Sequence, residues 1–146
     1  TLMERIYLAR KKATKRKGTA RTPPYEKYPE WSEARFFSFL RSALRSAWSK
    51  YPPKYTVLAK AKRKSESTNK RLKWEFQCNG CSLWHPQKDV SVDHIVPAGT
   101  LRSFDDLPAF CAKLFCSEEE LQVLCKTCHD KKTKQVREDK KNEEAK

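Results

Sequence analysis

The sequence contains few of the residues that build a large apolar core. Hydrophobic residues make up 38% of the 146 positions, and there are only three glycines and two isoleucines. A chain this short and polar buries a thin core, so we expect a source of stability besides apolar packing. The six cysteines are the obvious candidates for that role.

Long apolar stretches are also lacking. No run approaches the roughly 18 apolar residues of a membrane span, so we expect no contact with a membrane. Residues 2–9 are interrupted by Glu4 and Arg5 and are not typical of an apolar signal segment. We therefore expect a cytoplasmic protein in a reducing compartment, where paired cysteines bind metal or carry out redox chemistry more often than they form disulfides.

The excess positive charge is confined to one half of the chain. Residues 1–73 carry 21 basic and 5 acidic side chains, a net charge of +16. Residues 74–146 carry 11 basic and 13 acidic side chains, a net charge of −2, and the two halves together give the total of +14. The first half therefore favours a polyanionic partner, bound with an affinity that depends steeply on salt and weakly on sequence.

Two parts are expected within the basic half. Residues 1–29 predict a basic arm that orders on a polyanion, the alternative being a solvated tail without a specific partner. Residues 30–73 predict a helical, strongly basic extension whose arginines are candidates for phosphate contacts. Its main helix is expected from Pro29 to Lys50 with Ser32 as N-cap, and a shorter helix and a basic linker are expected over 54–64 and 62–71.

The second half has a different pattern of apolar and polar residues. Alternating patterns predict short strands over 72–76, 83–84 and 90–92, and helices are expected over 107–115 and from Leu124 onward. Residues 74–137 are therefore expected to form one module. Residues 138–146 predict a charged tail that frays.

The strongest signal is a pair of C-x-x-C motifs, Cys78-Asn79-Gly80-Cys81 and Cys125-Lys126-Thr127-Cys128, separated by 43 residues. Two such knuckles complete a tetrahedral Cys₄ set, which is typical of structural zinc. Gly80 is expected to supply a positive φ in the first knuckle. Zinc bound in this way would fasten a hairpin to the start of a helix.

Other interpretations of the cysteines remain open. The stretch Cys125–His129 also fits the pattern for attachment of a c-type haem, which leaves the first knuckle unexplained. A dithiol redox pair or an iron–sulfur cluster is a further alternative. Cys111 and Cys116 lie in an apolar context and predict buried, inert thiols.

Two of the three histidines adjoin these motifs. His94 follows Asp93 at the end of a predicted strand, and His129 follows Cys128 directly, whereas His85 is expected at the surface. A carboxylate and an imidazole from different elements can bind a divalent ion, and a second imidazole can take a proton from water. Strand alternation aims Asp93 and His94 at opposite faces, so both can reach one metal only if the chain bends or bulges there.

The order of these pieces resembles a known family. The series Cys78-x-x-Cys81, Val92-Asp93-His94-Ile95-Val96-Pro97 and Leu121-Gln122-Val123-Leu124-Cys125-x-x-Cys128-His129 is similar to the HNH endonucleases of bacteriophages, which belong to the His-Me finger or ββα-metal group. The similarity covers roughly residues 74–134. It implies an α+β fold in which a zinc-clamped ββα-metal module follows a basic, mostly helical extension.

The resemblance also implies an activity, the metal-dependent hydrolysis of DNA phosphodiester bonds. His94 would be the general base, Asp93 and His129 would hold a catalytic Mg²⁺ or Mn²⁺, and the four cysteines would hold structural Zn²⁺. Double-stranded DNA would be the partner, in the cytoplasm of a bacterial host. The candidate nucleic-acid contacts are Lys11, Lys12, Lys15, Arg16, Lys17, Arg41, Arg45, Lys62, Arg63, Lys64, Lys70, Arg71 and Lys132.

The sequence departs from the family at one position. Glu120 stands where the family's middle asparagine fixes the loop and the base histidine. The orienting role then falls to another residue, or the run Glu118–Glu120 lends a metal ligand. Two alternatives to a nuclease follow, a non-catalytic zinc-dependent nucleic-acid-binding protein and a packaging-associated phage component that needs a protein partner.

Overall fold

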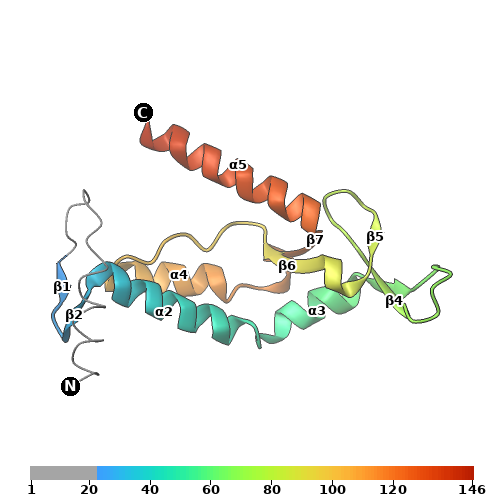
Figure 1. Ribbon diagram of the computed structural model, residues 1–146, viewed down its shortest axis with the longest axis horizontal. Coiled ribbons are helices and arrows are strands. Elements are labelled where there is room, and N and C mark those ends of the chain that lie inside the picture. Colours follow the sequence, from blue (N-terminus) through green and yellow to red (C-terminus); the bar gives the residue numbers. More distant parts are fainter. Residues whose placement is uncertain (1–22) are drawn as a thin grey trace, which may run out of the picture. The chain divides into compact units, whose positions relative to one another are not determined.

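The computed structural model describes residues 23–146, which form a mixed α/β protein. The elements follow in the order β1 (Pro24–Tyr25), β2 (Tyr28–Ser32), α2 (Glu33–Trp48), α3 (Pro52–Lys60), β3 (Lys62–Lys64), β4 (Trp74–Gln77), β5 (Trp84–His85), β6 (Val90–His94), α4 (Leu107–Leu114), β7 (Leu121–Cys125) and α5 (Lys126–Glu144) (Figure 1). The predicted mixture of helices and short strands is confirmed. None of the helices described is long and apolar enough to cross a membrane.

The described residues divide into two compact units, with the boundary between Phe36 and Phe37. In the first unit, β1 and β2 pair as an antiparallel hairpin, and the ring of Tyr25 stacks on that of Phe36 at 3.9 Å. The expected arm therefore has ordered strands over 24–25 and 28–29. Its cationic clusters, Lys11, Lys12, Lys15, Arg16 and Lys17, lie outside the described residues.

Helix α2 begins at Glu33, four residues later than predicted, because the preceding residues pair in β2. Ser32 is its N-cap as expected, since the Ser32 hydroxyl accepts the backbone N–H of Arg35 at 3.2 Å. The helix ends at Trp48, and α3 begins at Pro52, where the fixed φ of proline suits the first turn of a helix.

The predicted extent of the second helix and of the linker after it is wrong. Helix α3 ends at Lys60, and Lys62–Lys64 forms strand β3, which pairs with Trp74–Phe76 of β4. Strand β4 pairs in turn with β5, giving the order β3-β4-β5. This sheet crosses the boundary expected between residues 73 and 74, because three lysine and arginine residues can occupy a sheet edge whose polar face stays in water.

The second sheet consists of β6 and β7 in regular antiparallel register, from Val90 opposite Cys125 to His94 opposite Leu121. Helix α5 follows β7 without a loop (Figure 1). Strand β7 was not predicted, since its apolar run was assigned in part to the last helix. The expected fraying after Arg137 is also wrong, because α5 continues to Glu144.

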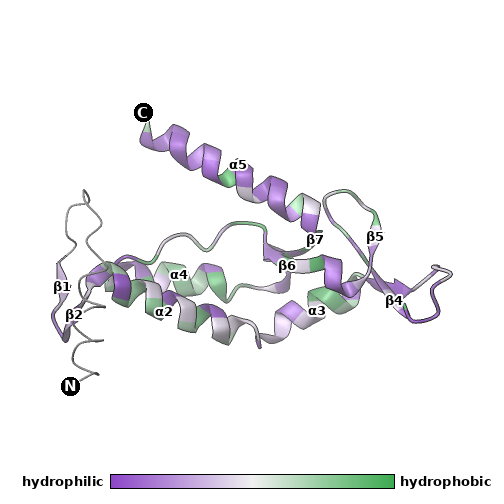
Figure 2. Cartoon of the chain, in the orientation of Figure 1, coloured by the Kyte–Doolittle hydropathy of each residue, from purple (hydrophilic) through white to green (hydrophobic). Residues whose placement is uncertain are grey.

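The core of the second unit is small and lies around β7 and α4. Its buried residues include Phe110 and Leu114 of α4, and Leu121, Val123 and Leu124 of β7. Helix α5 contributes no buried residue and is hydrophilic over most of its length (Figure 2). A helix of this composition needs an anchor other than apolar packing, and two of the cysteines lie at its start, Cys125 as its N-cap and Cys128 in its first turn.

Candidate functional site

The four cysteines of the two knuckles converge. Cys78 and Cys81 lie in the turn between β4 and β5, Cys125 ends β7, and Cys128 lies in the first turn of α5. Their sulfur atoms all lie within 4.8 Å of one another, and the sulfurs of Cys81 and Cys125 are 3.9 Å apart. With bonds of about 2.3 Å to a tetrahedral zinc ion, sulfur atoms are about 3.8 Å apart. The cluster therefore fits a metal such as zinc, and the predicted clamp between hairpin and helix is confirmed in its geometry.

Backbone donors surround the deepest sulfur of this cluster. The Sγ atom of Cys78 accepts N–H groups from Gly80 at 3.3 Å and from Cys125 at 3.2 Å. Burial acts to raise the pKa of this thiol, but backbone N–H donors outweigh it and lower the pKa to about 6. Hydrogen bonding to Cys125, burial and the other nearby sulfurs raise the pKa of Cys128 to about 12. Four thiols this close together cannot all lose their protons without a positive charge between them, because the thiolates repel one another. A bound dication supplies that charge, so this behaviour is expected of a metal-ligand set.

Gly80 serves the cluster in a different way from that predicted. Positive φ angles occur at Ser82 (63°) and Gly99 (86°) and not at Gly80. A Cβ at Gly80 would instead lie 2.9 Å from the Cys128 sulfur. Glycine is therefore required here because the second knuckle fills the space that a side chain would occupy.

His85 was expected to be a plain surface residue, but it belongs to the surroundings of the cluster. Its Nε2 atom lies 3.7 Å from the sulfur of Cys81, the exposed cysteine of the four. The signal was its place four residues after Cys81 on the returning strand of the hairpin. Of the two remaining cysteines, Cys116 is buried as predicted and its pKa is raised by burial, while Cys111 is half-buried.

A second group of polar side chains gathers where α5 passes the end of β6. Oδ1 of Asp93 lies 3.8 Å from Nε2 of His129. The other oxygen, Oδ2, accepts the amide of Gln122 at 3.3 Å and the ammonium of Lys132, which also contacts the carbonyl of His94. The structure thus brings together Asp93 and His129, as the sequence predicted for a shared ion. Gln122 and the direct contact of Lys132 with Asp93 were not predicted.

His94 is held from the opposite side of the strand. It is 8% exposed, and its Nε2 atom lies 2.8 Å from the carbonyl oxygen of Leu114, at the end of α4. Because a carbonyl only accepts, Nε2 donates this hydrogen bond and Nδ1 is the basic nitrogen. The ring also packs on that of Trp48 at 4.7 Å between centroids.

The alternation expected of a strand holds at Asp93 and His94. The pairing of β6 with β7 contains no bulge, so the side chains of Asp93 and His94 leave the strand on opposite faces. Both residues nevertheless line one cavity of about 410 Å³, because this cavity opens at the end of β6. Its other walls include Lys132, Arg137 and Lys140 of α5 and Arg45 of α2.

Glu120 stabilises the turn that precedes β7. Its carboxylate accepts the backbone N–H and the hydroxyl of Ser117, both at 3.1 Å, closing the turn Glu118–Glu120. Its own carbonyl accepts the N–H of Ile95 at 2.9 Å, directly after His94. Glu118 is paired with Lys60 at 2.5 Å. These carboxylates are therefore engaged within the loop and with α3, away from Asp93.

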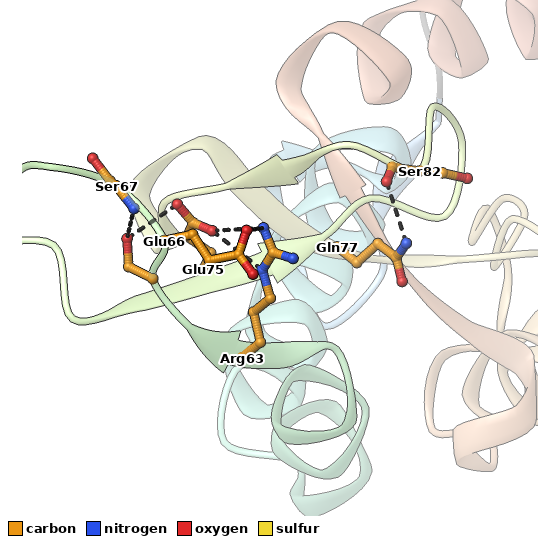
Figure 3. Close-up of polar contacts among 7 residues, drawn as sticks. Arg63, Glu66, Ser67, Glu75, Gln77 and Ser82 are labelled. Atoms are coloured by element: carbon orange, nitrogen blue, oxygen red, sulfur yellow. Dashed lines mark hydrogen bonds and ion pairs between the residues drawn. The ribbon is translucent and has the colours of Figure 1, made fainter.

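The basic residues of the β3–β4 hairpin differ in their availability. Arg63 contacts Glu75 and Glu66 and lies over the ring of Trp84, so it is part of the hairpin's own structure (Figure 3). Ser65 also donates to Glu75, which orders the start of the loop. The other candidates of this region, Lys62, Lys64, Lys70 and Arg71, are exposed, and Arg41 on α2 is half-buried.

A comparison of the chain with protein-family models, with curated proteins and with solved structures finds no significant match. The function is therefore argued from the geometry and chemistry of the described residues.

Proposed function

We propose that the protein is a metal-dependent DNA endonuclease of the HNH, or ββα-metal, type. The observation that carries the proposal is the approach of Asp93 and His129 to 3.8 Å at the point where β6, β7 and α5 meet. His94 lies beside them on the same cavity. This provides two ligands for a hard cation and one base from strand β6 and helix α5, in the order that the family resemblance implies.

His94 would be the general base of this site. Donation from Nε2 to the carbonyl of Leu114 fixes one tautomer and the orientation of the ring, and Nδ1 is left to accept a proton from the attacking water. Packing against Trp48 restricts the imidazole further. A base held in this way avoids the large loss of rate that follows from a small misplacement.

Asp93 and His129 would hold Mg²⁺ or Mn²⁺. When bound, the ion supplies stabilisation of charge on the scissile phosphate and on the leaving oxygen. Gln122 orients the Asp93 carboxylate through its amide. The ammonium of Lys132 contacts the same carboxylate, and it would be free to pair with the phosphate if that carboxylate held the ion.

The cysteine cluster would hold structural zinc. Helix α5 has no buried residue, so the position of His129 depends on the anchoring of its first turn. Zinc bound by Cys125 and Cys128 from this end, and by the β4–β5 turn from the other, supplies that anchor. In this proposal the structural metal determines where the catalytic ligand stands.

Incubation with supercoiled plasmid tests the activity. With Mg²⁺ or Mn²⁺ we expect relaxed or linear plasmid, and with EDTA or with His94→Ala we expect none. Ser91→Ala is the matched control, because Ser91 is an exposed residue of the same strand. Metal-dependent cutting that persists in His94→Ala would contradict the role of His94, and labelled RNA of equal length tests the alternative substrate.

Two observations favour a second candidate, a zinc-dependent nucleic-acid-binding protein without catalysis. The ammonium of Lys132 contacts Asp93 as a bound cation would, and Glu120 replaces the family's asparagine. Under this alternative, DNA is retained at low salt by both the unaltered protein and His94→Ala, and neither cuts it in the presence of either metal.

A further inference from the structure

The cavity next to His94 carries more positive charge than a single phosphate requires. Four cationic side chains line it, Arg45, Lys132, Arg137 and Lys140, against the single carboxylate of Asp93. Lys132 is paired with Asp93. Within residues 23–146, the other three cations form no ion pair with a carboxylate.

The three unpaired cations face one another from two helices. On α5, Arg137 and Lys140 are three positions apart and therefore lie on the same face of the helix, and both line the same cavity as Lys132. Arg45 lies on the opposite wall, on α2. Like charges that converge repel one another unless an anion binds between them. All three side chains are exposed, so an anion from solvent can reach them.

The size of the cavity agrees with a ligand larger than one phosphate. Its volume of about 410 Å³ spans from Asp93 and His94 to Lys140, two helical turns beyond Lys132. Lys132 to Lys140 covers about 12 Å of helix at 1.5 Å per residue, which exceeds the roughly 3.4 Å of duplex axis that separates adjacent phosphates of one strand. A second phosphate next to the scissile one therefore reaches the three cations.

We propose that Arg45, Arg137 and Lys140 form a second phosphate site, which binds the phosphate adjacent to the one that is cut. The inference rests on the proposed nuclease function and deepens it, because it states the class of substrate. The preferred substrate is an internal phosphodiester of a polynucleotide strand, and an ester with a single phosphate leaves this second site empty.

Binding provides a test that does not depend on cutting. In a His94→Ala background without added Mg²⁺ or Mn²⁺ and without chelator, a labelled oligonucleotide is titrated by fluorescence anisotropy at several salt concentrations. For the double variant Arg137→Gln/Lys140→Gln we expect the slope of log K against log salt to become shallower by about 1, as for the loss of one neutralised phosphate. The matched control is Lys134→Gln, because Lys134 is an exposed lysine of α5 that does not line the cavity. We expect this control to change the slope less than the double variant does.

Cleavage provides the second measurement. The ratio of oligonucleotide cleavage to hydrolysis of bis(p-nitrophenyl) phosphate, which has one phosphate, is expected to fall about tenfold in the double variant and in Arg45→Gln, as for the loss of a charge-assisted hydrogen bond. Equal salt slopes for the double variant and Lys134→Gln would overturn the phosphate site. A reduced slope in a protein that cuts neither substrate would keep the phosphate site and overturn the nuclease.

Discussion

The Nε2 atom of His129 lies 3.8 Å from Oδ1 of Asp93, although one residue is on α5 and the other on β6. With bonds of about 2.1 Å, two ligands of one octahedral ion lie about 3 to 4.2 Å apart. The pair is therefore spaced to share an ion with little movement of either side chain. A regular strand register and a cysteine-anchored helix start produce this spacing.

Replacing either member of this pair is expected to weaken binding of the catalytic metal. For Asp93→Asn and His129→Ala we expect Mn²⁺ affinity, measured by electron paramagnetic resonance, to fall about 10- to 100-fold and plasmid cleavage to fall with it. Asp89→Asn removes an exposed carboxylate just before β6 and is the control. Unchanged Mn²⁺ affinity in both site variants would place the metal elsewhere.

Lys132→Met is expected to have the opposite effect on metal affinity. The ammonium of Lys132 contacts the same carboxylate that would bind the ion, so its removal leaves Asp93 free for the ion. We expect several-fold tighter Mn²⁺ binding, together with weaker DNA binding. Lys131→Met, an exposed neighbour on α5, should change neither quantity by as much. Weaker Mn²⁺ binding in Lys132→Met would show that the lysine supports the site and does not compete in it.

Much of this site follows from spacing along the sequence. The two C-x-x-C motifs identified the four cysteines, and the adjacency of His129 to Cys128 placed that imidazole on an anchored helix. Such local patterns are readable because each ligand pair is set within one turn of chain. The pairing of Asp93 with His129 could then be expected from the order of the elements.

What the sequence could not predict depends on contacts between distant segments. Nothing near His94 indicates that the carbonyl of Leu114 would fix its tautomer, because every residue carries a carbonyl. The basic run Lys62–Lys64 reads as a linker by composition, and only its partner β4 makes it a strand. The sequence predicts a glycine at position 80 for a positive φ, whereas the structure requires it because Cys128 fills the adjacent space. That contact between the two knuckles cannot be inferred from the sequence.

Gly80→Ala is expected to damage the metal cluster. The added methyl group would lie 2.9 Å from the Cys128 sulfur and 3.0 Å from its Cβ, so one knuckle has to move. We expect a loss of about 1–3 kcal/mol in the free energy of unfolding, as for overpacking of a filled site, and a lower affinity for zinc. Thermal unfolding and a competitive zinc titration measure the two effects. Asn79→Ala, an exposed side chain in the same turn, is the control and should change neither.

Removal of the structural metal is expected to release α5 before it affects the rest of the protein. The helix has no buried residue, so without the ion its first turn is held chiefly by polar contacts such as that of Lys132. After chelation we expect faster amide hydrogen exchange over residues 126–144 and in the β4–β5 turn, while α4 remains protected. Re-addition of Zn²⁺ restores protection, and equal exchange with and without chelator would show that the cysteines hold no structural metal.

Glu120 offers the sharpest test of how the base histidine is positioned. Its carboxylate closes the turn at Ser117, and its carbonyl holds Ile95 beside His94, so it links the loop to the base without touching the cavity. Glu120→Ala is expected to cost about 0.5–2 kcal/mol of stability, like the loss of other caps, and to reduce kcat more than it raises KM. Glu120→Gln keeps an acceptor for Ser117 and should restore most of both. If Glu120→Ala loses stability but keeps kcat, the turn is only structural, and Leu114 with Trp48 suffices to hold the base.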